Sequence, residues 1–171
     1  PNAMAWPKSY PWMEKRDYFK TNPDFFTMTT NGKRVPLQLC FGNPELRKEL
    51  TKNILKNIEI LKKERPEELI INLSATDNGG KFCYCPACRK LEEKYKNPGG
   101  PFYDYLFELC ALLKKKYPDV RVLTLAYRLE QTQKPPVMPA GTAFPDNLIV
   151  FFASLYDDAD KTWNDPVNRH N

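Results

Sequence analysis

Residues 35–75 read VPLQLCFGNPELRKELTKNILKNIEILKKERPEELIINLSA, and this stretch decides the fold. Asn43-Pro44 supplies the N-cap and first-turn residue types of a helix start. Apolar residues then recur every three to four positions until Arg65-Pro66 interrupts the pattern: Leu46, Leu50, Ile54, Ile58 and Leu61. The flanking segments Val35–Cys40 and Glu68–Ala75 are short and apolar, as strands are. The stretch therefore predicts a strand–helix–strand unit with a long amphipathic helix.

The rest of the chain continues this alternation of helices and strands. The sequence predicts a short helix near Pro86–Tyr95 and, after a Gly-Gly-Pro break, a helix that ends at Tyr117-Pro118-Asp119. The second helix has Phe102, Leu106, Cys110 and Leu113 on one face. The sequence predicts further strands over Val120–Ala126 and Leu148–Ser154, separated by a Pro-rich loop. Because strands this apolar are usually buried on both faces, we expect all four strands to form a parallel sheet.

Two architectures fit four parallel strands: part of a closed barrel, or a small open doubly wound sheet. A complete (β/α)₈ barrel takes typically ~250 residues, and this chain has 171. The length favours an α/β fold of parallel βα repeats, about half of a TIM-type barrel, over residues 18–171. We interpret residues 1–17 as the remnant of a cloning tag and an N-terminal extension. The uncovered sheet edges of a half-barrel predict self-association as a homo-oligomer.

The composition excludes several functional classes. The chain has 26 Lys and Arg, 21 Asp and Glu, a formal charge of +5 and one histidine. His170 alone cannot build a histidine-based triad or a histidine-rich zinc site. The basic residues alternate with Glu at helical spacing, as on solvated helix faces, so we expect no nucleic-acid partner. No apolar run reaches the roughly 18–20 residues that a membrane span needs.

Three of the five cysteines form the motif Cys83-Tyr-Cys85-Pro-Ala-Cys88. Such a dense group of thiols suits one soft metal ion, and tetrahedral zinc needs a fourth ligand. Cys40 can supply it, because it ends the first predicted strand and parallel strands end at the same edge. Structural zinc is the favoured interpretation, with packed free thiols or a disulfide as alternatives. Cys110 shares a helix face with apolar residues and is expected to be a small buried hydrophobe.

A polar turn follows the second predicted strand, with the sequence SATDNGG at residues 74–80. In a parallel barrel this position lies at the catalytic rim. Asp77 is therefore the candidate catalytic acid, base or charge stabiliser, and Asn78 is a candidate for orienting a ligand amide or hydroxyl. The alternative for Asp77 is a capping role within the turn.

Several motifs occur in the same order as in one known family: Tyr18–Phe26, Asn31–Arg34, Gln38–Cys40, Asn43–Glu45, the turn through Gly80 into Cys83–Cys88, Thr124–Tyr127 and Lys134–Pro136. Together they resemble the bacterial carbohydrate-active barrel family known as domain of unknown function 4838, part of which is classed as glycoside hydrolase family 163. The resemblance runs from about Tyr18 to Ser154. The Cys-x-Cys-x-x-Cys segment is its most distinctive part.

The resemblance implies a (β/α)₈ barrel that degrades bacterial or host glycans, with endo-β-N-acetylglucosaminidase activity in the characterised branch. It also implies a periplasmic, cell-surface or secreted location. In related hexosaminidase-like barrels one carboxylate directs the acetamido group of the substrate and another protonates the leaving oxygen. This chain shows Asp77-Asn78 where the family commonly has Asn-Asp, and no Glu follows. Tyr127, directly after the third predicted strand, is a candidate for stacking on a sugar, with plain packing as its alternative.

Three functional hypotheses follow from these observations. The leading one is a fragment of a glycan-processing barrel, with the cysteine cluster bracing the loop that carries Asp77. The second is a non-catalytic module that binds glycans or a protein, motivated by the missing second carboxylate, so enzymatic activity stays an open question. The third is a metal-binding domain held together by zinc, which is disfavoured because a chain of this length can bury a core without a metal.

Overall fold

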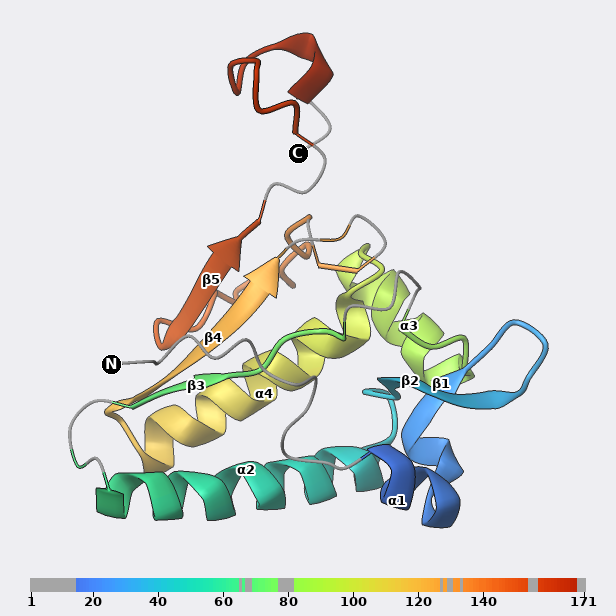
Figure 1. Ribbon diagram of the computed structural model, residues 1–171, viewed down its shortest axis with the longest axis vertical. Helices are drawn as coiled ribbons and strands as arrows, with labels where there is room; N and C mark the ends of the chain where they lie inside the picture. The colour runs from blue at the N-terminus through green and yellow to red at the C-terminus, as the bar shows by residue number, and fades with distance from the viewer. Residues whose placement is uncertain are drawn as a thin grey trace.

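The computed structural model describes residues 15–64, 66, 69–76, 82–126, 128, 131–132, 134–153 and 157–168 (Figure 1). In chain order the elements are α1 (Lys15–Thr21), the 3₁₀ turn η1 (Pro23–Phe25), β1 (Phe26–Met28), β2 (Arg34–Leu39), α2 (Pro44–Glu64), β3 (Leu69–Asn72), α3 (Pro86–Tyr95), α4 (Gly100–Lys116), β4 (Val120–Ala126), β5 (Leu148–Phe152) and η2 (Pro166–Asn168). The described strands form two open sheets and close no barrel.

The larger sheet is parallel, and its spatial order β3-β4-β5 repeats the order of the strands in the chain. Leu69 pairs with Val120, and Val122 pairs with Leu148. Successive parallel neighbours are the arrangement of a (β/α) barrel. The sheet therefore confirms the prediction of a partial parallel α/β fold.

The main core forms where α2 and α4 lie along the sheet (Figure 1). The predicted stripe of α2 is confirmed, because Leu46, Leu50, Ile54 and Ile58 are fully buried. From α4, Phe102, Tyr105, Leu106 and Cys110 enter the same core, and Phe41 and Phe82 join them. The ring of Phe41 stacks on Tyr105 at 5.6 Å and meets Phe102 edge-on at 5.2 Å. Among the described helices, none has the length and apolarity to cross a membrane.

The expected place of the first predicted strand is wrong. Arg34–Leu39 is β2, which pairs antiparallel with β1 in a separate hairpin and does not join the parallel sheet. The turn between the two strands places Gly32 at φ +81°, in the left-handed region that glycine adopts without strain. The sequence pattern missed β1 because three residues are too few to show an alternation.

The side chain of Gln38 links the hairpin to the backbone just after β3, where no strand of the hairpin pairs with the parallel sheet. The Nε2 of Gln38 donates to the carbonyl of Thr76 at 2.8 Å, and the N–H of Thr76 donates back to Oε1 of Gln38 at 3.1 Å. Both residues are buried, so this reciprocal pair satisfies backbone groups that would otherwise lie unpaired inside the protein. The hairpin is thereby fixed beside the carboxyl end of β3.

The expectation that the parallel strands are buried on both faces is also wrong. Ile70 on β3 and Phe151 on β5 are 53% and 50% exposed, although Ile71 and Val122 are buried. The reason is that α2 and α4 both contribute to one core, on one side of the sheet. Across the described residues, the opposite face stays open to solvent.

Two isoleucines of α2 test the assigned core face. Ile58 is fully buried, whereas Ile60 is 48% exposed. Ile58→Ala should lower the free energy of unfolding by about 2–5 kcal/mol, because it leaves a cavity in the core. Ile60→Ala is the matched control and should change it by less than about 0.5 kcal/mol. Urea denaturation followed by circular dichroism measures both, and equal losses would contradict the buried face of α2.

Candidate metal centre

Four cysteines from three segments meet beside the hairpin. Cys40 directly follows β2, Cys83 and Cys85 lie in the segment before α3, and Cys88 lies in the first turn of α3. Each is at most 6% exposed, and the four sulfurs lie within 4.8 Å of one another. The structure thus brings the four predicted ligands together, although the hairpin rather than a parallel strand delivers Cys40.

The distances between sulfurs separate the three interpretations of the cluster. Cys40 Sγ lies 3.5 Å from the Sγ atoms of both Cys83 and Cys85 and 3.8 Å from that of Cys88. A disulfide requires about 2.05 Å between sulfurs, so the cysteines are free thiols. Zinc with Zn–S bonds of about 2.3 Å holds tetrahedral sulfurs about 3.8 Å apart. The cluster is therefore close to the size of a closed four-thiolate site.

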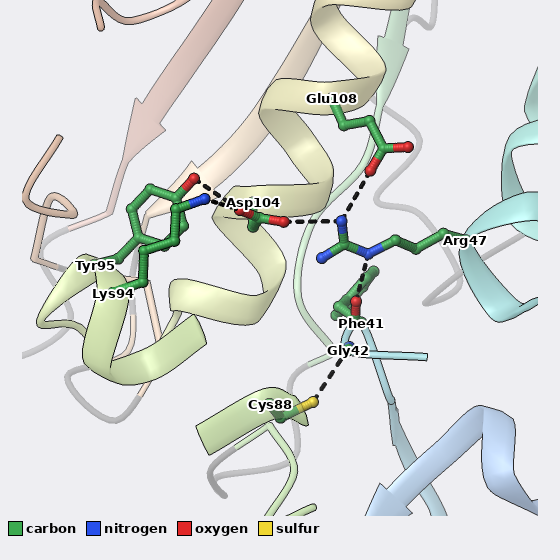
Figure 2. A network of polar contacts seen from close by, with 8 residues as sticks. All are labelled: Phe41, Gly42, Arg47, Cys88, Lys94, Tyr95, Asp104 and Glu108. Carbon is green, nitrogen blue, oxygen red and sulfur yellow. Dashed lines mark hydrogen bonds and ion pairs between the residues drawn. The ribbon is translucent and has the colours of Figure 1, made fainter. Parts of the chain in front are cut away.

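Positive and hydrogen-bonding groups face the sulfurs. The N–H of Met28 donates to Cys83 Sγ at 3.3 Å. The N–H of Gly42 donates to Cys88 Sγ at 3.3 Å, as Figure 2 shows. The guanidinium of Arg34 lies 3.7 Å from Cys83 Sγ and donates to the carbonyl of Phe26 at 2.6 Å. Such groups stabilise thiolates, which are the form that binds a metal.

The sulfurs shift one another's proton affinity in opposite directions. Hydrogen bonding with Cys40 lowers the pKa of Cys83 to about 6 and lowers the pKa of Cys85 further. Hydrogen bonding with Cys83 raises the pKa of Cys40, and hydrogen bonding with Cys40 raises the pKa of Cys88. Without a cation, the cluster favours a mixture of thiolates and thiols. A divalent soft metal ion would stabilise all four as thiolates.

Two hydrogen bonds hold the cysteine segment against the hairpin. The Thr27 hydroxyl donates to the carbonyl of Phe82 at 2.6 Å, and the N–H of Tyr84 donates to the carbonyl of Met28 at 2.9 Å. Pro86 then occupies the first turn of α3, where its missing N–H costs nothing. A Cβ on Gly42 would lie 2.9 Å from Cys88 Sγ, so only glycine allows this close approach.

The other predicted site residues have different outcomes. Asp77, Asn78 and Tyr127 lie outside the described residues. Cys110 is fully buried in the main core, where burial raises its pKa to about 12, which agrees with its expected role as a small hydrophobe. Sequence reasoning missed Arg34 and Gly42. The one available signal was the position of Gly42 two residues after a predicted ligand.

Comparison with known proteins gives a family whose description names no activity. The family model described as Domain of unknown function (DUF4838) matches residues 3–171. No curated protein and no solved structure gives a significant match. The geometry of the cluster therefore carries the functional argument.

The effect of the Arg34 charge on the sulfurs can be tested by the pH at which zinc is released. Arg34→Gln removes a cation that favours thiolates, so it should raise the pKa of the cluster and move the midpoint of zinc release to higher pH. At constant neutral pH, zinc binding should weaken by roughly tenfold or more, as for other residues that support metal ligands. A chromophoric chelator follows the release as the pH is lowered.

Two variants control this measurement. Arg34→Lys keeps the charge and should hold the midpoint near that of the unchanged protein. Lys33→Gln removes an exposed neighbouring charge, which solvent screens, and should have little effect. An unchanged midpoint in Arg34→Gln would show that its charge does not act on the sulfurs.

Proposed function

The chain belongs to the family described as Domain of unknown function (DUF4838), and we propose that it is a glycan-processing domain braced by a structural zinc ion. Cys40, Cys83, Cys85 and Cys88 bind the zinc. Asp77, Asn78 and Tyr127 contribute to a glycan-binding rim, with Asp77 as the acid or base group. Zinc acts on the position of the rim loop and takes no part in the chemistry.

The observation that carries the zinc proposal is the convergence of four buried sulfurs within 4.8 Å. Cysteines that merely fill a core pack against apolar side chains, as Cys110 does in the main core. The four cysteines instead form a cluster of their own, against which only Met28 of the described hydrophobic residues packs. A closed set of four thiolates is typical of structural zinc sites.

The bracing role follows from the residues on either side of the loop that carries Asp77. Thr76 precedes this loop and is held by Gln38 through two hydrogen bonds. Phe82 follows the loop and is held by Thr27. Gln38 and Thr27 both belong to the hairpin, and Cys40 directly follows it. A metal ion that joins Cys40 to the cysteine segment therefore fixes both ends of the loop relative to each other.

The sheet supports the proposed rim. Because β3 and β4 are parallel, the segments that follow them in sequence start from the same edge of the sheet. Asp77 and Asn78 follow β3, and Tyr127 follows β4. The side chain of Gln131 donates to the carbonyl of Thr76 at 3.4 Å and links the two segments. A carboxylate, an amide and an aromatic ring are the groups that a glycan site uses for proton transfer, hydrogen bonding and stacking.

A non-catalytic glycan-binding module of the same fold is the second candidate. The observation in its favour is the single carboxylate at the turn, because glycoside hydrolysis ordinarily needs two. In this case Asp77 accepts hydrogen bonds from sugar hydroxyls and transfers no proton. The two candidates differ in turnover but share the same binding residues.

Metal analysis tests the zinc proposal directly. Purified protein should contain about one zinc per chain. Cys88→Ser should weaken zinc binding by more than about 100-fold, because it removes a ligand rather than a supporting group. Cys110→Ser is the matched control, since Cys110 lies in the main core, and it should retain zinc. Protein that neither contains zinc nor takes it up would contradict the proposal.

Removal of zinc should loosen the hairpin and the cysteine segment but leave the main core folded. The reason is that the cysteines form a cluster separate from the main core, whereas Phe26 and Leu39 of the hairpin lie in that core. Hydrogen exchange after chelation should show lost protection at the amides of Met28, Gly42 and Tyr84, which lie at the cysteine cluster, with helical circular dichroism retained. Complete unfolding would show instead that the metal determines the whole fold.

The glycan proposal is tested with oligosaccharides that contain N-acetylglucosamine. The protein should bind them, and Tyr127→Ala should weaken binding by about 1–3 kcal/mol, as for the loss of a stacking ring. If the domain is an enzyme, Asp77→Asn abolishes hydrolysis and leaves binding nearly unchanged. Binding without hydrolysis favours the non-catalytic module. Absence of binding at millimolar glycan, by titration calorimetry and for a broad panel, would refute both candidates.

A further inference from the structure

We propose that Arg47 is a positioning residue of the metal centre that acts on Cys88 through one peptide group. This inference rests on the proposed metal binding and adds a residue from α2, which contributes no ligand. Arg47 is the fourth residue of the long helix and lies far from the Cys83–Cys88 motif in the sequence. Its charge reaches the centre through the backbone of the β2–α2 turn.

The contacts form a direct chain from the guanidinium to the sulfur (Figure 2). The Nε of Arg47 donates to the carbonyl of Phe41 at 2.5 Å. The same peptide group carries the N–H of Gly42, which donates to Cys88 Sγ at 3.3 Å.

The peptide group is suited to transmit this interaction. It is planar, and its C=O and N–H point in opposite directions. A cation that binds the oxygen therefore fixes the direction of the N–H. It also polarises the peptide and makes the N–H a stronger donor to a negatively charged sulfur. Hydrogen bonds of this kind orient metal ligands and tune their affinity.

Acidic residues of α4 hold Arg47 in place. Its Nη1 lies 2.8 Å from Asp104 and 2.8 Å from Glu108. The side chains of Arg47 and Asp104 are only 16% and 17% exposed, whereas that of Glu108 is 61% exposed. Burial alone would raise the pKa of Asp104, but hydrogen bonds from Lys94 and Arg47 lower it. Asp104 is thus a charged, half-buried anchor for the guanidinium.

Gly42 makes the short distance to the sulfur possible. A Cβ at this position would lie 2.8 Å from the backbone nitrogen of Cys88 and 2.9 Å from its Sγ. A larger residue would move the turn away from α3 and lengthen the N–H···S bond. The Phe41–Gly42 peptide that Arg47 binds is therefore the one that packs against Cys88.

Cobalt(II) provides the test, because it occupies zinc-thiolate sites and its sulfur-to-metal charge-transfer band reports on the sulfurs. Arg47→Met should weaken cobalt binding by about 10–100-fold, the range for residues that support metal ligands. The band should also move to lower energy, since a weaker N–H···S bond stabilises the sulfur lone pairs less. Competition with a chelator gives the affinity, and absorption spectroscopy gives the band.

Lys62→Met is the matched control on the same helix. Lys62 pairs with Asp119, so its loss removes an α2 ion pair without touching the Phe41–Gly42 peptide. Both the affinity and the band should stay as in the unchanged protein. Should Arg47→Met fail to fold by circular dichroism, Arg47→Lys replaces it, because a lysine cannot bond the carbonyl and both carboxylates with the same fork geometry.

The outcomes separate this inference from the proposed function. If the unchanged protein binds no cobalt or zinc, the metal proposal itself fails. If it binds metal and the Arg47 variant shows the same affinity and band, the inference is overturned. A weaker affinity with an unmoved band also overturns it, because looser helix packing alone would explain that result.

Discussion

Four cysteine sulfurs cannot share one buried space as thiolates unless positive charge lies among them. Repulsion between like charges is strong where water is excluded, and burial disfavours each thiolate further. The Arg34 guanidinium and two backbone N–H donors place positive charge and partial positive charge beside the sulfurs. These groups compensate only part of the charge of four thiolates. In the proposed function a cation at the centre supplies the remaining positive charge, and the sulfur spacing suits a tetrahedral one.

The fold has two centres of stability that depend on different forces. Apolar burial holds α2, α4 and the parallel sheet together, and this force needs no cofactor. The hairpin and the cysteine segment contribute Phe26, Leu39 and Phe82 to this core, and specific polar contacts add further links to the rest of the fold. Gln38 links the hairpin to Thr76, and Thr27 links it to Phe82. The residues on either side of Asp77 and Asn78 in the sequence, Thr76 and Phe82, are thus both held by the hairpin, which is why the proposed function couples the metal centre to the rim.

Local patterns were sufficient to predict the regular parts of this fold. The stripe from Leu46 to Ile58 and the apolar run of β4 reflect burial against one neighbour, which periodicity reveals. The predicted place of β2 in the parallel sheet was wrong, because the residue pattern of a strand does not say which strand it pairs with. The grouping of the four cysteines was nevertheless predicted, since three of them lie within six residues and Cys40 ends a predicted strand. The roles of Arg34 and Arg47 could not be predicted from the sequence, because they depend on contacts that form only in the folded chain. Arg34 contacts Cys83, 49 residues away, and Arg47 contacts the carbonyl of Phe41, 6 residues away.

Helix α3 is linked to Arg47 near both of its ends. Near its start, Cys88 receives the hydrogen bond from the peptide that Arg47 holds. Near its end, Lys94 and Tyr95 bond Asp104 at 2.7 Å and 2.9 Å, and Asp104 bonds Arg47 (Figure 2). A ten-residue helix is about 15 Å long, so these ties fix its direction as well as its position. A metal ion that fixes Cys88 therefore also restrains the packing of α3 on α4, and the ion pairs of Asp104 in turn hold the first turn of α3 where its cysteine can serve as a ligand.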